Sequence, residues 1–236
     1  MTSTTIFIRA TLPPVLGVLY DIHGNLPALE RVLADAEGLD IDRWLLGGDY
    51  GTPSPWPEET LARLRELPSA TWIRGNGERW LFEPPTDRQE VMEVYDLFRG
   101  QLPEAEMRTL YELPTEAELD GILYTHGSPL SDVESFPPDP SDDDEHMLAG
   151  VRDRTVVFGH SHQQFRRAGP NNTVLVNPGS VGMPLDGDVR AAWATWDGDF
   201  EFRRTEYDVA RAAAGYRSLG GDFGEFAAQR IERGSD

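Results

Sequence analysis

Four of the five histidines in this chain lie in short polar segments that each come directly after an apolar stretch. Asp21 and His23 follow one such stretch, His126 follows another, and His160 and His162 follow a third. This placement differs from that of histidines packed in a core, and neutral imidazoles beside carboxylates are typical ligands of divalent metals. The pattern therefore indicates metal chemistry.

Two further polar segments follow apolar stretches, although each is an ordinary turn sequence when taken alone. One contains Asp49 after two glycines, and the other contains Asn76 between Gly75 and Gly77. Together the candidate ligands are Asp21, His23, Asp49, Asn76, His126, His160 and His162. Seven side chains are too many for one Mn, Fe or Zn ion, so the simplest arrangement is two ions that share one bridging carboxylate.

Strands and helices alternate in the first half of the chain, and each candidate segment there falls where a strand ends. Predicted strands cover residues 14–21, 43–47 and 71–74, and predicted helices cover 25–37 and 57–67. This alternation favours right-handed crossovers and a largely parallel sheet. Because the carboxyl ends of parallel strands meet at one edge of a sheet, we expect the candidate ligands to converge there.

The second half of the chain is richer in strands. Predicted strands cover residues 117–119, 122–125, 155–158, 174–176, 191–196 and 201–204. This favours two packed sheets over one doubly wound sheet. Residues 79–112 are predicted to be mostly helical, and the acidic, proline-rich residues 129–147 to form a solvated loop that contains a surface His146. Two helices are expected to end the chain, capped by Asp208 and by Asp222 with Glu225 in a capping box.

The ordered set Asp-x-His, Gly-Asp, Gly-Asn, Thr-His and Gly-His-x-His resembles the calcineurin-like metallophosphoesterase superfamily, in particular its small prokaryotic phosphodiesterase-like branch. The resemblance extends from about Val15 to Tyr207 and includes residues 177–182 (NPGSVG) and Asp186-Gly187. It implies an α/β fold, a four-layered α/β/β/α sandwich of two packed mixed sheets. The domain would span residues 15–207, with an N-terminal extension (1–14) and a C-terminal helical appendage (208–236).

The resemblance also implies a role for each candidate ligand. Asp21, His23 and His162 would bind one ion, Asn76, His126 and His160 would bind the other, and Asp49 would bridge them. Asp49, Asn76 and His126 would be the catalytic members of this set. The chain departs from the family at Gly77, where many members have a histidine near the leaving group. Restoring that side chain by Gly77→His is expected to favour hydrolysis of alkyl esters.

The implied function is hydrolysis of phosphate esters, preferentially phosphodiesters, by a hydroxide that bridges two divalent ions, Mn, Fe, Ni or Zn. The alternatives are a phosphomonoesterase, a protein phosphatase, a dinucleoside polyphosphate hydrolase, or a scaffold that has kept the fold without catalysis. Arg74 and Arg79 flank the Gly-Asn segment and could hold a phosphate oxygen, but pairing with nearby acids is an equal expectation. Asn25 is expected to cap a helix and Ser180 to be structural.

Composition narrows the function classes. The chain has 236 residues, no cysteine and no lysine, which excludes thiolate and Schiff-base chemistry. Its 41 acidic and 21 basic residues give a net charge of −20, which disfavours non-specific nucleic-acid binding, an exonuclease role and contact with anionic membranes. A small phosphate ester or nucleotide is the expected partner, a cytoplasmic location is the default expectation, and oligomeric state is left open.

Overall fold

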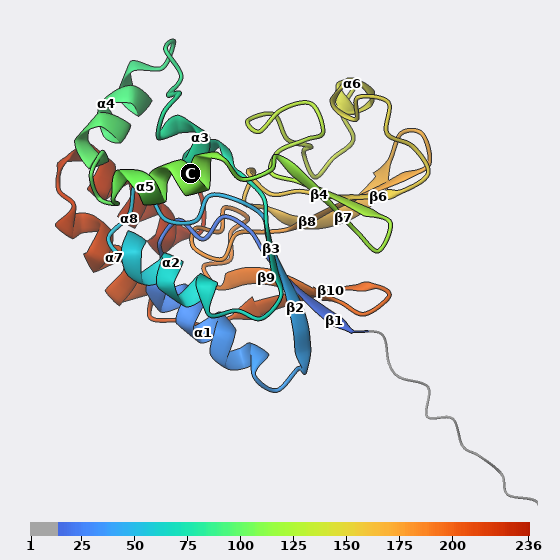
Figure 1. The fold of residues 1–236 in the computed structure, drawn as a ribbon, viewed down its shortest axis with the longest axis horizontal. Helices are drawn as coiled ribbons and strands as arrows, with labels where there is room; N and C mark the ends of the chain where they lie inside the picture. The colour runs from blue at the N-terminus through green and yellow to red at the C-terminus, as the bar shows by residue number, and fades with distance from the viewer. Residues whose placement is uncertain (1–13) are drawn as a thin grey trace, which may run out of the picture.

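The computed structural model describes residues 14–236, and its first sheet takes three strands from the alternating first half of the chain and two from near the C-terminus (Figure 1). β1 (Val15–Leu19), β2 (Ile41–Leu46) and β3 (Ala70–Trp72) are parallel neighbours. α1 (Leu26–Ala36) and α2 (Pro57–Arg65) connect them, as predicted. β9 (Ala191–Trp196) pairs antiparallel with β1, and β10 (Phe200–Thr205) completes a hairpin at the edge. The resulting order is β10-β9-β1-β2-β3.

The second sheet has the order β4-β5-β6-β8-β7. Its parallel centre is β5 (Ile122–Thr125), β6 (Thr155–Val157) and β8 (Thr173–Pro178), and β4 (Glu116–Leu119) and β7 (Gln164–Gly169) are antiparallel edge strands. The sequence analysis did not predict β7. This strand carries Arg166 and Arg167, so it lacks the apolar run that marks the buried strands, as an edge strand can.

The two sheets pack face to face through an apolar core. Its buried members are Leu16, Val18, Tyr20, Leu45, Ile73, Ile122, Tyr124, Val157, Val176 and Ala194. The predicted α/β fold with two packed mixed sheets is confirmed. The outer layer over the second sheet is thin and consists of α6 (Asp144–Met147) with the segment around it.

The other helices lie on the side of the first sheet, where Figure 1 shows α4 near the C-terminal pair. They are α3 (Asn76–Trp80), α4 (Gln89–Phe98), α5 (Glu104–Tyr111), α7 (Val209–Ser218) and α8 (Gly221–Arg233). The rings of Phe98 and Phe223 lie 5.5 Å apart between centroids, so α4 contacts α8. No helix within residues 14–236 is long and apolar enough to cross a membrane.

The two predicted C-terminal caps have different outcomes. The Asp208 side chain accepts a hydrogen bond from the Arg211 N–H and caps α7, as predicted. The predicted capping box at Asp222 is wrong, because α8 begins at Gly221 and Asp222 lies inside its first turn. Gly220, with φ of 76°, is the N-cap, so the helix starts two residues earlier than predicted.

The acidic segment 129–147 is a loop for most of its length, but the prediction that it is only solvated is wrong. Phe136 is fully buried, and the carboxylate of Asp144 is buried and accepts two hydrogen bonds from Arg167, at 2.7 and 2.9 Å. A buried carboxylate requires such a partner, so Arg167 of β7 and this loop determine each other's position. His146 is exposed, as expected.

Candidate metal centre

The candidate ligands lie in the turns just beyond the strand ends, and backbone hydrogen bonds connect these turns. The N–H of Asp21 donates to the carbonyl of Gly48 at 3.2 Å, and the N–H of His23 donates to the carbonyl of Asp49 at 2.8 Å. In the second sheet, the N–H of Gly159 donates to the carbonyl of His126 at 2.7 Å. The parallel pairing thus continues past the strands and holds the turns side by side.

Five of the seven candidate ligands have left-handed backbone conformations. Their φ angles are 52° at Asp21, 49° at His23, 56° at Asp49, 63° at His160 and 57° at His162. The paired ligands are not alternate residues of a strand, because β1 ends at Leu19 and β6 at Val157. Each non-glycine residue in this conformation costs on the order of 1–3 kcal/mol, and such strain concentrates at functional sites.

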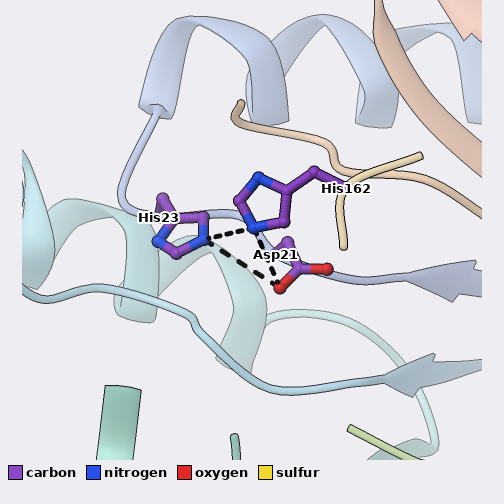
Figure 2. Close-up of side chains that lie close together, drawn as sticks. All are labelled: Asp21, His23 and His162. Atoms are coloured by element: carbon purple, nitrogen blue, oxygen red, sulfur yellow. Dashed lines mark hydrogen bonds and ion pairs between the residues drawn. The ribbon is translucent and has the colours of Figure 1, made fainter. Parts of the chain in front are cut away.

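Asp21, His23 and His162 form one group of the site (Figure 2). The two Nε2 atoms of His23 and His162 lie 3.0 Å apart, and Oδ1 of Asp21 lies 3.4 Å from Nε2 of His162 and 3.9 Å from Nε2 of His23. Oδ2 of Asp49 lies 3.8 Å from Nε2 of His23. The four side chains therefore present donor atoms to one small volume.

The second group lies on the other side of Asp49. Oδ1 of Asp49 is 3.5 Å from Nε2 of His126, whose other neighbour is the Asn76 amide at 3.0 Å. The same amide lies 2.8 Å from Nδ1 of His160. Oδ1 of Asp21 is also only 3.9 Å from Nε2 of His126, so it belongs to both groups. The structure thus brings all seven predicted residues together in two adjoining groups, with the two oxygens of Asp49 facing one group each.

Backbone carbonyls fix the orientation of two histidine rings. Nδ1 of His162 donates to the carbonyl of Met183 at 2.7 Å, and Nδ1 of His126 donates to the carbonyl of Gly47 at 2.8 Å. Because a carbonyl only accepts, each ring carries its Nδ1 proton there and turns Nε2 toward the centre. This arrangement of an outer hydrogen bond and an inner lone pair is typical of metal-binding histidines.

The donor set fits divalent ions. Oδ1 of Asp21 is buried without a hydrogen-bond partner within residues 14–236, and such an orphaned carboxylate oxygen requires a positive charge nearby. Ligands held about 2.1 Å from a metal are about 3.0–3.4 Å from each other, which is close to the separations within both groups. Carboxylate, imidazole and amide groups together suit Mn, Fe, Ni or Zn.

The electrostatics of the site favour an ionised carboxylate at Asp21 and neutral rings at His23 and His160. Burial alone would raise the pKa of Asp21, but His162, His126 and His23 hold it well below its usual range. Burial lowers the pKa of His23 to about 3, and the neighbouring His162 adds to the fall. Burial likewise lowers the pKa of His160 to about 4. Both rings are therefore neutral at pH 7 and available to a metal.

The remaining groups bind protons more tightly than such groups usually do. Burial raises the pKa of Asp49 to about 7, and Glu78 and Asp21 add to the rise against the opposing effect of His126. Burial lowers the pKa values of His126 and His162, but the carboxylates of Asp49 and Asp21 outweigh it and raise both. A metal must displace such protons, so binding is coupled to proton release.

Glu78 positions Asp49 and was not recognised as such from the sequence. Its buried carboxylate accepts hydrogen bonds from the backbone N–H groups of Asp49, Tyr50 and Gly75, at 2.9, 2.8 and 2.9 Å. A carboxylate four residues after a predicted strand end, shortly after the Gly-Asn pair, is the sequence signal that could have pointed to it.

Gly77 packs directly against Asp49. Its N–H donates to Oδ1 of Asp49 at 2.7 Å, and a Cβ at this position would lie 2.8 Å from the same oxygen. A side chain here would therefore displace Asp49, which argues against the expected benefit of Gly77→His.

The two arginines that flank the Gly-Asn segment, Arg74 and Arg79, form hydrogen bonds with other parts of the chain. Arg79 donates two hydrogen bonds to Asp132, at 2.6 and 2.7 Å, and Arg74 donates to the carbonyl of Tyr111 at 2.8 Å. The alternative of pairing with acids therefore holds for Arg79, and neither arginine is directed at the ligands.

The side chain of Asn25 accepts from the Ala28 N–H at the start of α1, and Oγ of Ser180 donates to the carbonyl of Asp21, so both are structural as expected.

A cavity of about 950 Å³ opens over the candidate ligands. Its floor includes His23, Asp49, Asn76, His160 and His162, and its walls come from α4, α7 and α8. The apolar part of the wall is Val91, Val94, Leu185, Phe223 and Phe226. The hydroxyl of Tyr216 in α7 donates to the carbonyl of His23, so the C-terminal helices support the site as well as cover it.

Comparison with known proteins agrees with this geometry. The calcineurin-like phosphoesterase superfamily domain matches residues 15–199. An uncharacterised protein of Methanocaldococcus jannaschii is 27% identical over 229 residues, which cover 84% of this chain and 90% of that protein. A metallophosphoesterase from Sphaerobacter thermophilus superposes with a TM-score of 0.76 at 24% identity, over 94% of this chain and 99% of that one. A hypothetical protein from Pyrococcus horikoshii gives 0.78 at 20% identity, with the same coverage of both chains.

Proposed function

Because the chain belongs to the calcineurin-like phosphoesterase superfamily, we propose that it hydrolyses phosphate esters, with phosphodiesters as its preferred substrates, at a centre of two divalent ions. The observation that supports this most is the pair of adjoining ligand groups on either side of Asp49. Asp21, His23 and His162 would hold one ion, Asn76, His126 and His160 the other, and Asp49 both.

Bound divalent ions supply the positive charge that polarises phosphoryl oxygens and lowers the pKa of water for in-line attack. Other residues of the chain position the side chains that would bind these ions. Glu78 and Gly77 fix the position of Asp49, and the carbonyls of Gly47 and Met183 orient two histidine rings. The carboxylates of Asp21 and Asp49 attract cations to the site, and bound cations would make this one place attractive to a phosphate in an otherwise acidic molecule.

The cavity supports a diester over a phosphorylated protein. Its volume of about 950 Å³ exceeds what one phosphate group needs, and its walls are partly apolar. A diester carries two organic groups, and a chamber of this kind can bury the second group while the phosphate lies on the floor. A scaffold without catalysis is disfavoured because every ligand position holds a side chain able to bind metal.

The test is hydrolysis by the purified protein loaded with Mn, Fe, Ni or Zn, with bis(p-nitrophenyl) phosphate, p-nitrophenyl phosphate and a dinucleoside polyphosphate as substrates. We expect metal-dependent turnover that is fastest on the diester. His126→Ala should abolish it, and His146→Ala, which removes an exposed histidine outside the centre, should not. A metal-loaded protein without turnover on any ester would support the scaffold instead.

A further inference from the structure

Tyr95 lines the same cavity as Asp49, Asn76 and His160, although it comes from α4 and belongs to no recognised motif. A Cβ placed on Gly77 would lie 3.3 Å from the Tyr95 hydroxyl oxygen and 2.8 Å from Oδ1 of Asp49. The hydroxyl and the carboxylate therefore flank the same point beside Gly77, and both residues line the cavity.

The ring of Tyr95 is held by packing, but its hydroxyl is available to donate a hydrogen bond. The residue is 9% exposed, and its ring packs edge-on against Trp80 with centroids 5.6 Å apart. Within residues 14–236 the hydroxyl has no hydrogen-bond partner, whereas the hydroxyl of the buried Tyr50 lies 2.6 Å from each of two backbone carbonyl oxygens that can accept its proton. A positioned donor that faces a cavity without a protein partner is suited to a ligand.

A phosphate group bound here needs donors besides the metals. Arg79 is held by Asp132, and Arg74 by the carbonyl of Tyr111, so neither guanidinium beside the Gly-Asn turn is free to move onto the floor. Burial, with Asp49 and Glu78 nearby, raises the pKa of Tyr95, which keeps its O–H group a donor. A neutral donor is also compatible with the negative charge of Asp49.

We propose that the Tyr95 hydroxyl donates a hydrogen bond to an oxygen of the phosphate group bound at the candidate metal centre. The proton stays on Tyr95 throughout, so the residue binds and orients the phosphate without a covalent or proton-transfer step. The inference rests on the proposed function for its substrate class, but a phosphate-binding measurement tests it without any turnover.

The experiment compares the wild-type protein with Tyr95→Phe, which keeps the ring against Trp80 and removes only the hydroxyl. Tyr111→Phe is the matched control, since its hydroxyl donates to Glu83 outside the cavity. Calorimetry at saturating manganese measures the Kd of inorganic phosphate, and elemental analysis measures bound manganese. A hydrogen bond to a charged acceptor is worth about tenfold to a hundredfold in affinity, so the Kd should rise by that factor in Tyr95→Phe only.

An unchanged phosphate Kd in Tyr95→Phe, or a metal-loaded wild type that does not bind phosphate, would overturn the inference. Loss of manganese from Tyr95→Phe would also overturn it, because the hydroxyl would then support the ligands and not the phosphate. If the wild type binds phosphate in a Tyr95-dependent way but hydrolyses no ester, the proposed function fails and the binding role of Tyr95 stands.

Discussion

Oδ2 of Asp21 accepts a hydrogen bond from the backbone N–H of His160 at 2.9 Å. Asp21 follows β1 in the first sheet and His160 follows β6 in the second, so this bond joins the two sheets at the candidate metal centre. The other oxygen of the same carboxylate faces the histidines. One side chain therefore links sheet packing to the ligand groups.

Metal should consequently stabilise the fold. Ions that bind only the folded chain at a hundred times their Kd add about 2.7 kcal/mol, which for a protein of this size corresponds to a rise of roughly 5–10 °C in Tm. Thermal unfolding with excess manganese or with chelator measures this difference. Asp21→Ala should lose most of the rise, whereas Asp35→Ala, on the exposed face of α1, should keep it. Equal Tm values for the metal-loaded and chelated wild type would contradict the coupling.

Metal affinity should increase with pH between 6 and 8. The carboxyl of Asp49, with a pKa of about 7, is mostly protonated at pH 6 and mostly ionised at pH 8, so a metal displaces its proton at the lower pH. Calorimetric titration with manganese in two buffers of different ionisation enthalpy counts the protons released. We expect more release at pH 6 than at pH 8, and less in Asp49→Asn. Release that does not depend on pH would refute this assignment.

Glu78→Gln should weaken the centre without touching a ligand. The glutamine cannot accept all three backbone hydrogen bonds that the carboxylate accepts, so we expect a loss of about 1–3 kcal/mol in the free energy of unfolding and weaker manganese binding. Glu58→Gln, at an exposed position of α2, is the control. If denaturant unfolding and metal binding match the wild type, Glu78 does not position Asp49.

Gly77→Ala should lower manganese affinity, because its Cβ would lie 2.8 Å from Oδ1 of Asp49 and one of the two groups must move. Gly38→Ala meets no atom within 4 Å and should leave the affinity unchanged. Gly77→His should be at least as damaging as Gly77→Ala. A Gly77→His protein with full metal content and faster alkyl-ester hydrolysis would show that Asp49 has room to adjust.

The sequence predicted those features of the fold and site that depend on local patterns of residues. Each candidate ligand follows an apolar strand, and parallel strands bring their carboxyl ends together, so the convergence of Asp21, Asp49 and His126 was predictable. The left-handed conformations of Asp21 and His160 were not, because they arise from hydrogen bonds between turns that are distant in sequence. The same limit applies to α8, where Gly220 and not Asp222 starts the helix.

Contacts between residues distant in sequence explain the other features that the sequence did not predict. Asp144 in the acidic loop was predicted to be solvated, but it is buried and accepts hydrogen bonds from Arg167 of β7, an edge strand that was not predicted. Tyr95 occupies an ordinary helical position in α4, and only the tertiary structure brings it into the lining of the same cavity as Asp49. Arg167 and Asp49 are distant in sequence from Asp144 and Tyr95 respectively, so no local spacing could reveal either relationship.

The central claim is that two ions share Asp49, and counting metal per chain tests it most directly. Elemental analysis of protein equilibrated with excess manganese and freed of unbound ions should give two ions per chain for the wild type and at most one for a folded Asp49→Ala protein. A folded wild type that never exceeds one ion per chain, or an Asp49→Ala protein that retains two, would contradict the account.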